Sequence, residues 1–324
     1  KSILVWDMNW QYVSFFSWLT RTIRETTADS IFYSFSISYG SSTLGLLGYY
    51  LLSPFNVILL LFDTVNLPLG LWIVTILKLS CCGLTMYLFL ARSFEQNRKD
   101  FLLFSTSYAV MGYNVAQMQN IMWIDAVILL PLVALGIKNY VKKKKFGLFV
   151  LSLAAAVAIN FYTGYMLCLF SAIYLLAEVA LDSEQFVFKK IFKKYFGGLF
   201  YIVLAVMMSG FSLLPVYYEI SGSRMKESSL RSTFYMLKNL DSRMWELGNK
   251  LCIGTYNVHQ LKSGLPNIYA GCLCFVLFIL FFVSRKYKVS KKEKIIYAIT
   301  CVVLLLSFVS VGVNMIWHGF AQAN

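Results

Sequence analysis

Two aspartates have surroundings that suit acid–base chemistry. Asp7 lies in the aromatic stretch Val5–Tyr12, and a carboxylate that aromatic neighbours partly desolvate is a stronger proton acceptor than one in water. The alternative is an ordinary aspartate at a membrane interface. Gln11 follows Asp7 by four residues, so on a helix both side chains would face one pocket. Asp125 is the second candidate, although a carboxylate at the start of a helix is also favoured by the helix dipole alone.

One lysine is predicted to lie inside the bilayer, where burying a positive charge costs free energy. Lys78 is midway along the apolar stretch 67–91. A lysine at the centre of a bilayer normally faces a partner or a cavity, because the charge is otherwise unsolvated. The sequence therefore predicts that Lys78 either pairs with a carboxylate or holds a phosphate.

Further polar and aromatic side chains are of the types that bind sugars. The candidates for substrate binding, besides Lys78, are Gln11, Tyr12, Asn120, Asn160, Tyr162, Tyr165, Arg224, Asn314, Trp317 and His318. Tyrosine and tryptophan are also enriched at membrane interfaces for other reasons, so each signal is weak alone. Arg224 belongs to a basic segment, 217–267, which fits either an anionic lipid or polymer partner or a solvated loop.

The motifs of common soluble enzymes are absent. The sequence contains no Walker A loop, GxGxxG, GxSxG or HExxH pattern. Its two histidines are too few for a histidine metal cluster, and its seven cysteines include no CxxC pair, which argues against a zinc site or a disulfide framework.

Composition places these residues in a membrane. The chain has 324 residues, of which 59% are hydrophobic and 14% charged, whereas soluble domains carry about 25% charge. We predict an all-α polytopic membrane protein that forms a single transmembrane domain, with lipid as the solvent for most of its surface. The eight predicted spans are 67–91, 101–116, 124–141, 146–160, 162–180, 197–216, 268–284 and 295–312. Alternatively, 146–160 and 162–180 form one kinked hairpin around Asn160.

The orientation follows from lysine and arginine. The net charge is +14, and the basic residues gather in the loops 92–100, 138–145, 181–195 and 285–294. Alternating spans place these loops on one side, which is cytoplasmic by the positive-inside rule, so we expect a membrane partner and no nucleic acid. The outer parts are then 1–66, 117–123, 217–267 and 313–324.

The first 66 residues are predicted to be an outer loop with interfacial helices. Residues 10–24 mix aromatic side chains with arginine, which is typical of a helix in the interface plane. Residues 44–62 are uncharged but broken at Ser53–Pro54, and only four residues separate them from the next span. We therefore predict an interfacial or re-entrant helix there and not a full span.

Several short motifs, taken in order, carry a resemblance to a known family. They are Asp7–Tyr12, Tyr49–Phe55, Met122–Ala126 with Pro131, Asn160–Met166, Gly264–Tyr269 and Asn314–Phe320. In these the chain resembles the YfhO-type bacterial membrane protein family, which is similar to the GT-C glycosyltransferases. The resemblance implies a GT-C-like helical bundle in the bacterial plasma membrane with its active face outward. Because it places one span before Lys1 and more spans after Asn324, it also implies that the chain is a fragment.

The activity implied by the resemblance is sugar transfer. A sugar would pass from a polyprenyl-phosphate carrier to an anionic cell-envelope polymer of the teichoic-acid type. Asp7 matches the acidic residue that GT-C enzymes place in the first outer loop, and some of these enzymes need a divalent cation. The alternatives are a transporter or flippase of a lipid-linked anionic substrate, which should show internal repeats and broken helices, and an inactive truncated scaffold.

Overall fold

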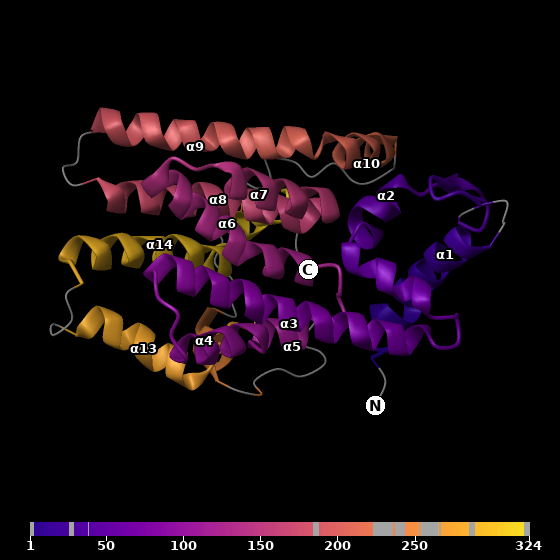
Figure 1. The fold of residues 1–324 in the computed structure, drawn as a ribbon, viewed down its shortest axis with the longest axis horizontal. Helices are drawn as coiled ribbons and strands as arrows, with labels where there is room; N and C mark the ends of the chain where they lie inside the picture. The colour runs from indigo at the N-terminus through magenta and orange to yellow at the C-terminus, as the bar shows by residue number, and fades with distance from the viewer. Residues whose placement is uncertain are drawn as a thin grey trace.

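The computed structural model describes residues 3–25, 29–37, 39–183, 188–222, 236, 244–252, 254, 265, 267–284 and 289–320. Within these ranges the chain is almost entirely helical, and its one sheet is a short hairpin in which β1 (Tyr33–Ser34) pairs antiparallel with β2 (Ser41–Ser42). The long helices run side by side along the longest axis, and the N-terminal helices pack at one end of them (Figure 1).

The N-terminal unit contains several short helices besides this hairpin. They are η1 (Met8–Tyr12), α1 (Val13–Arg24), α2 (Leu44–Leu46), η2 (Leu47–Leu51) and η3 (Pro54–Leu61). Their apolar faces share a core that includes Met8, Phe16 and Leu59 with Leu71 of the first long helix. The helix predicted at 10–24 is therefore confirmed, while its position in the membrane interface stays a prediction.

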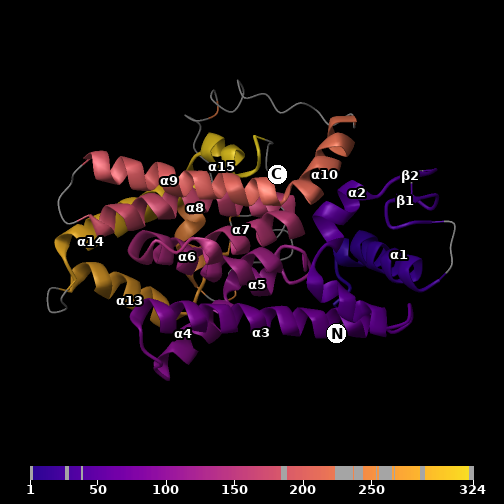
Figure 2. The same ribbon diagram turned by 45° about the horizontal axis from the view of Figure 1, so that its top comes forward.

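The bundle follows in chain order. Its elements are α3 (Leu67–Phe94), α4 (Asp100–Ala109), α5 (Gly112–Ala116), α6 (Ile124–Lys143), α7 (Gly147–Ile159), α8 (Phe161–Asp182), α9 (Phe188–Met208), α10 (Gly210–Gly222), η4 (Met244–Leu251), α13 (Cys272–Val283), α14 (Lys291–Val309) and α15 (Val311–Trp317). The helix α10 turns away from α9 and reaches α2 of the N-terminal unit (Figure 2).

The bundle is densest between α6, α7, α8 and α9. Fully buried residues such as Val133, Phe149 and Leu175 form its core. Two glycines permit the close approach: a Cβ atom at Gly136 would lie 2.4 Å from the backbone nitrogen of Phe149, and one at Gly164 would lie 2.4 Å from the Cα of Val157. Side chains at either position would push the helices apart, so the tight packing of α7 depends on these two glycines.

The structure supports a polytopic membrane fold with fewer established spans than predicted. Among the described residues, four helices are long and apolar enough to cross a membrane, namely α3, α6, α8 and α9, or up to five with one bent pair. The bent pair is Leu44–Leu51 with Pro54–Leu61, whose axes differ by 92°. The break predicted at Ser53–Pro54 is thus confirmed, because proline begins a new helix there. Eight spans and a GT-C-like bundle stay predictions.

Three predicted features of the spans are wrong. The expected span 101–116 is broken between α4 and α5, and the expected span 197–216 is broken at Ser209, whose hydroxyl bonds the carbonyls of Ala154 and Ala205 at 2.9 Å each. The helix α9 also begins at Phe188, inside the predicted basic loop. Its lysines alternate there with phenylalanines on other faces, so average hydropathy hides a regular amphipathic helix.

Candidate functional site

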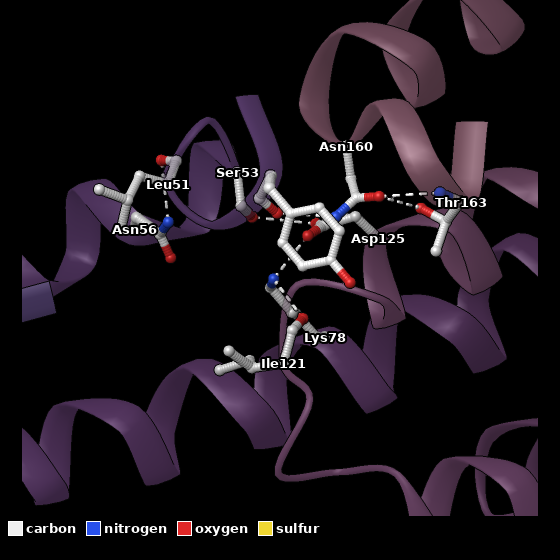
Figure 3. Close-up of polar contacts among 9 residues, drawn as sticks. Leu51, Ser53, Asn56, Lys78, Ile121, Asp125, Asn160 and Thr163 are labelled. Carbon is white, nitrogen blue, oxygen red and sulfur yellow. Dashed lines mark hydrogen bonds and ion pairs between the residues drawn. The ribbon is translucent and has the colours of Figure 1, made fainter. Parts of the chain in front are cut away.

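A buried ion pair joins two long helices. Lys78 of α3 lies with its Nζ 2.6 Å from Oδ2 of Asp125 on α6, and the two side chains are 0% and 4% exposed. The Lys78 ammonium also donates to the carbonyl of Ile121 at 2.9 Å, and the Ser53 hydroxyl donates to Oδ1 of Asp125 at 3.0 Å. Figure 3 shows these groups converging from three segments. The partner predicted for Lys78 is therefore a carboxylate, and the network fastens the bent pair to the bundle.

Asn160, at the start of α8, makes a further contact between the bundle and the bent pair. It is the N-cap of α8, where its side-chain oxygen accepts from the backbone N–H of Thr163 at 2.8 Å and from the Thr163 hydroxyl at 2.9 Å. Its Nδ2 donates to the carbonyl of Tyr49 at 2.7 Å (Figure 3). Asn160 therefore uses its hydrogen bonds within the protein: it starts a helix and anchors the bent pair.

An aromatic cluster lies beside this network. We give that name to Tyr12, Tyr49, Tyr50, Trp123, Tyr162 and His318. Ring centroids are 5.2 Å apart for Tyr12 and Tyr50, and 4.5 Å for Tyr50 and Tyr49. They are 6.0 Å apart for Tyr49 and Tyr162, and 5.8 Å for Tyr162 and His318. Segments more than a hundred residues apart in sequence thus meet in one continuous row of rings.

Hydrogen bonds fix the rings of the cluster. The hydroxyl of Tyr12 donates to Oδ1 of Asn120 at 3.1 Å, and Nε1 of Trp123 donates to the hydroxyl of Tyr49 at 3.3 Å. The Tyr162 hydroxyl bonds Nδ1 of His318. These contacts hold the rings of the cluster in one arrangement.

Asp7 is exposed next to the cluster. Its carboxylate is close enough to Tyr12 and Tyr50 to act on both electrostatically. The pKa of Tyr12 is raised, first by burial and then by the neighbouring Tyr50 and Asp7. Trp6, directly before Asp7, has a φ of +49°, a left-handed conformation that bulky residues adopt only under constraint and that recurs at active sites. Asp7 is thus exposed and follows a residue in a constrained conformation, whereas Asp125 is buried.

Two π-helical turns carry much of the site. They are Met8–Tyr12 and Leu47–Leu51, so Tyr12 comes from one turn and Tyr49 and Tyr50 from the other. Such turns are rare in proteins as a whole, but those that occur are often found at functional sites. The wider turn also changes the expected geometry, because residues five apart replace residues four apart on one face. Tyr12 is accordingly the partner near Asp7, and Gln11 lies exposed.

The C-terminal candidates hold α15 in place. The hydroxyl of Tyr165 donates to the carbonyl of Ile316 at 2.9 Å, and Nδ2 of Asn314 donates to the carbonyl of Ser307 at 3.3 Å. Trp317 is half-buried on α15. These contacts bring His318 to Tyr162, so α15 covers one side of the aromatic cluster. Arg224 lies outside the described residues.

One further acidic residue was not predicted. Glu219 of α10 accepts from the backbone N–H of Gly45 at 2.5 Å and from the hydroxyl of Ser42 at 3.1 Å, both in the N-terminal unit. A side chain at Gly45 would meet this carboxylate, since a Cβ would lie 3.1 Å from its Cδ. Glu219 lies just beyond the predicted span 197–216, where an acidic residue carries no signal in the sequence. Among the described residues, no group of three or more His, Cys, Asp or Glu side chains could hold a metal ion.

Comparison with known proteins gives one match. The family model described as "Bacterial membrane protein YfhO" matches residues 1–324. No curated protein and no solved structure matches the chain. The assignment to a family therefore rests on a match that covers every segment of the site.

Proposed function

Because the chain belongs to the YfhO family of bacterial membrane proteins, we propose that it is a glycosyltransferase of the bacterial plasma membrane. It moves a sugar from a polyprenyl-phosphate carrier to an anionic cell-envelope polymer, such as a teichoic-acid-type polymer, at the outer face. The observation that supports this most is the exposed Asp7 carboxylate beside a row of aromatic rings assembled from five separate segments.

In this mechanism Asp7 is the general base. It takes the proton from an acceptor hydroxyl as that oxygen attacks the anomeric carbon. The bond from the anomeric carbon to the phosphate oxygen breaks at the same time, and polyprenyl phosphate leaves with the bonding electrons. The sugar is thereby transferred with inversion. A positioned base of this kind contributes roughly 10²- to 10⁴-fold in rate.

The aromatic cluster positions the donor sugar. Tyr49, Tyr50 and Tyr162 offer ring faces on which a sugar can lie, and Asp7 is close enough to Tyr12 and Tyr50 to act on both electrostatically. Because Trp123 and Asn120 hold the tyrosine hydroxyls, the rings keep one arrangement, which lowers the entropic cost of orienting the substrate.

We assign the ion pair a structural role. Lys78 is fully buried and already neutralised by Asp125, so we assign both residues to holding α3, α6 and the bent pair together. The leaving phosphate then needs a cation from elsewhere. Arg224 and the other basic residues of 217–267 are our candidates, since that segment is predicted to be on the same side as Asp7.

One observation favours the alternative of a transporter. The bent pair is broken by 92°, and broken helices near a substrate are typical of secondary transporters. The two functions differ in one respect that can be measured: an enzyme cleaves the sugar–phosphate bond, and a transporter leaves it intact.

The test uses the full-length protein in liposomes. A panel of labelled polyprenyl-phosphate sugars is supplied inside the bilayer and an envelope polymer outside. Label on the polymer together with free polyprenyl phosphate supports a transferase. Intact donor that moves between leaflets without release of polyprenyl phosphate would contradict it and favour the transporter.

A further inference from the structure

A second pocket lies at the opposite end of the bundle from the aromatic cluster. It has a volume of about 840 Å³ and opens between the C-terminal ends of α6 and α8 and the first half of α9. The aromatic cluster, in contrast, is built around the beginnings of α6 and α8. The second pocket is therefore separate from the proposed transferase site, and nothing in that function requires it.

The rim of the pocket is basic. Among the described residues, Lys144 at the end of α6 and Lys190, Lys193 and Lys194 on α9 line it, together with one carboxylate, Asp182. Lys194 is paired with Asp182 at 2.7 Å. Within the described part of the chain the other three lysines have no ion-pair partner, so the pocket keeps a net positive charge.

The floor of the pocket is aromatic and close-packed. The Tyr140 hydroxyl donates to the carbonyl of Lys194 at 2.8 Å, and a Cβ atom at Gly197 would lie only 2.7 Å from that hydroxyl oxygen. Tyr201 stacks on Phe146 with ring centroids 4.5 Å apart. Gly197 thus permits the close contact between α9 and Tyr140, and Lys193 and Lys190 lie on the same helical face one and two turns earlier.

The adjacent face of α9 is apolar and exposed. Phe188, Phe192, Phe196 and Phe200 recur every four residues and are 78%, 51%, 50% and 62% exposed. Side chains four apart form one stripe along a helix, here roughly a quarter to a third of a turn away from the lysines. Because α9 is long and apolar enough to cross a membrane, this stripe is suited to contact acyl chains.

We propose that this pocket binds the phosphate headgroup of an anionic phospholipid, with the acyl chains against the phenylalanine stripe of α9. The volume is that of a small-ligand site, and basic pockets between membrane helices recognise anionic headgroups. A soluble phosphate would use the lysines alone. A phospholipid contacts both: its phosphate binds the lysines, and its acyl chains lie against the phenylalanine stripe on the neighbouring face of α9.

The experiment measures retained lipid. The full-length protein is reconstituted in bilayers that contain phosphatidylglycerol and phosphatidylcholine and then extracted, and the lipids that remain are counted by native mass spectrometry. We expect retained phosphatidylglycerol on the wild type, and at least an approximately 10-fold loss in the variant Lys190→Gln/Lys193→Gln. Inorganic phosphate at millimolar concentration should not displace the lipid.

The matched control is Lys99→Gln/Lys291→Gln. It removes the same charge from two exposed lysines outside the pocket. Unchanged binding in this control shows a site, whereas an equal loss in both variants would show only diffuse attraction to a basic surface and would overturn the proposal. Equal retention of phosphatidylcholine and phosphatidylglycerol, or displacement by inorganic phosphate, would also overturn it. Thermal unfolding of each variant identifies a loss that is due to misfolding.

Discussion

Lys78 on α3 and Asp125 on α6 form an ion pair of 2.6 Å within the bundle, and the Ser53 hydroxyl of the bent pair donates to the same carboxylate. Removing two charges from solvent is costly, and the cost is recovered only when both charges and their remaining hydrogen-bonding positions are satisfied. Here the carbonyl of Ile121 and the hydroxyl of Ser53 supply those contacts. The pair thus connects the bent pair to α3 and α6 of the bundle.

Breaking this pair from one side should destabilise the protein strongly. Lys78→Met and Asp125→Leu alone each leave an unpaired buried charge, and we expect a loss of about 3–5 kcal/mol for each. The double variant removes both charges and should recover most of that loss. A double-mutant cycle on unfolding in detergent measures the coupling. Single variants as stable as the wild type would contradict the burial of this pair.

The bent pair should leave both of its ends on one side of the membrane. Its 92° bend and the proline at the start of η3 motivate a re-entrant arrangement. Topology reporters fused after Gly40 and after Asn66 should both report the outer side. As a control, a cysteine at Lys143 should be protected from an impermeant reagent in intact cells and one at Asp63 should be labelled. Opposite signals from the two reporters would establish that the segment crosses.

The contact between His318 and Tyr162 should be sensitive to pH. Burial lowers the pKa of His318 below its ordinary value of 6.5, because the neutral ring is favoured in the folded protein. A depressed folded-state pKa contributes stability that is complete above pH 6.5 and is lost as the pH falls toward the folded-state value.

The measurement is thermal unfolding from about pH 8 to about pH 5. The wild type should lose stability below pH 6.5, and His318→Gln should not show that component. Tyr162→Phe is the partner control, since it removes the hydroxyl that bonds His318 and leaves the ring in place. Parallel pH profiles for the wild type and His318→Gln would remove His318 from this role.

Much of the fold could be predicted from the sequence because its signals are local. Apolar stretches located α3, α6 and α8 to within a few residues, and Pro54 marked the break in the bent pair. The start of α9 could not be located in this way, since its lysines and phenylalanines alternate on different faces and an average over the window cancels them. The division at Ser209 depends on a hydrogen bond to Ala154 of another helix, which no local pattern shows.

The sequence supplied candidate residues one by one, but it could not show how they are arranged in space. Lys78 required a partner because of its position, yet the sequence could not choose between Asp125 and a phosphate. Asn160 stays a predicted substrate ligand, and the structure adds that it is the N-cap of α8, a role that the sequence did not indicate. The pairing of Asp7 with Gln11 stays a prediction, and the π-helical turn at Met8–Tyr12 adds Tyr12 as a neighbour of Asp7 that α-helical spacing did not indicate. Such turns depend on tertiary packing, so spacing rules misplace the neighbours.

The central claim is that Asp7 is the general base, and the most direct measurement is sugar transfer by Asp7→Asn. The variant protein, full length and matched for membrane level, is assayed with labelled donor and envelope polymer. Asp7 is exposed, so we expect stability to change by no more than about 0.5 kcal/mol and donor binding to persist. Transfer should fall by about 10²- to 10⁴-fold. Asp63→Asn, which neutralises another exposed carboxylate of the predicted outer region, should transfer at the wild-type rate. Wild-type transfer by Asp7→Asn would contradict the mechanism.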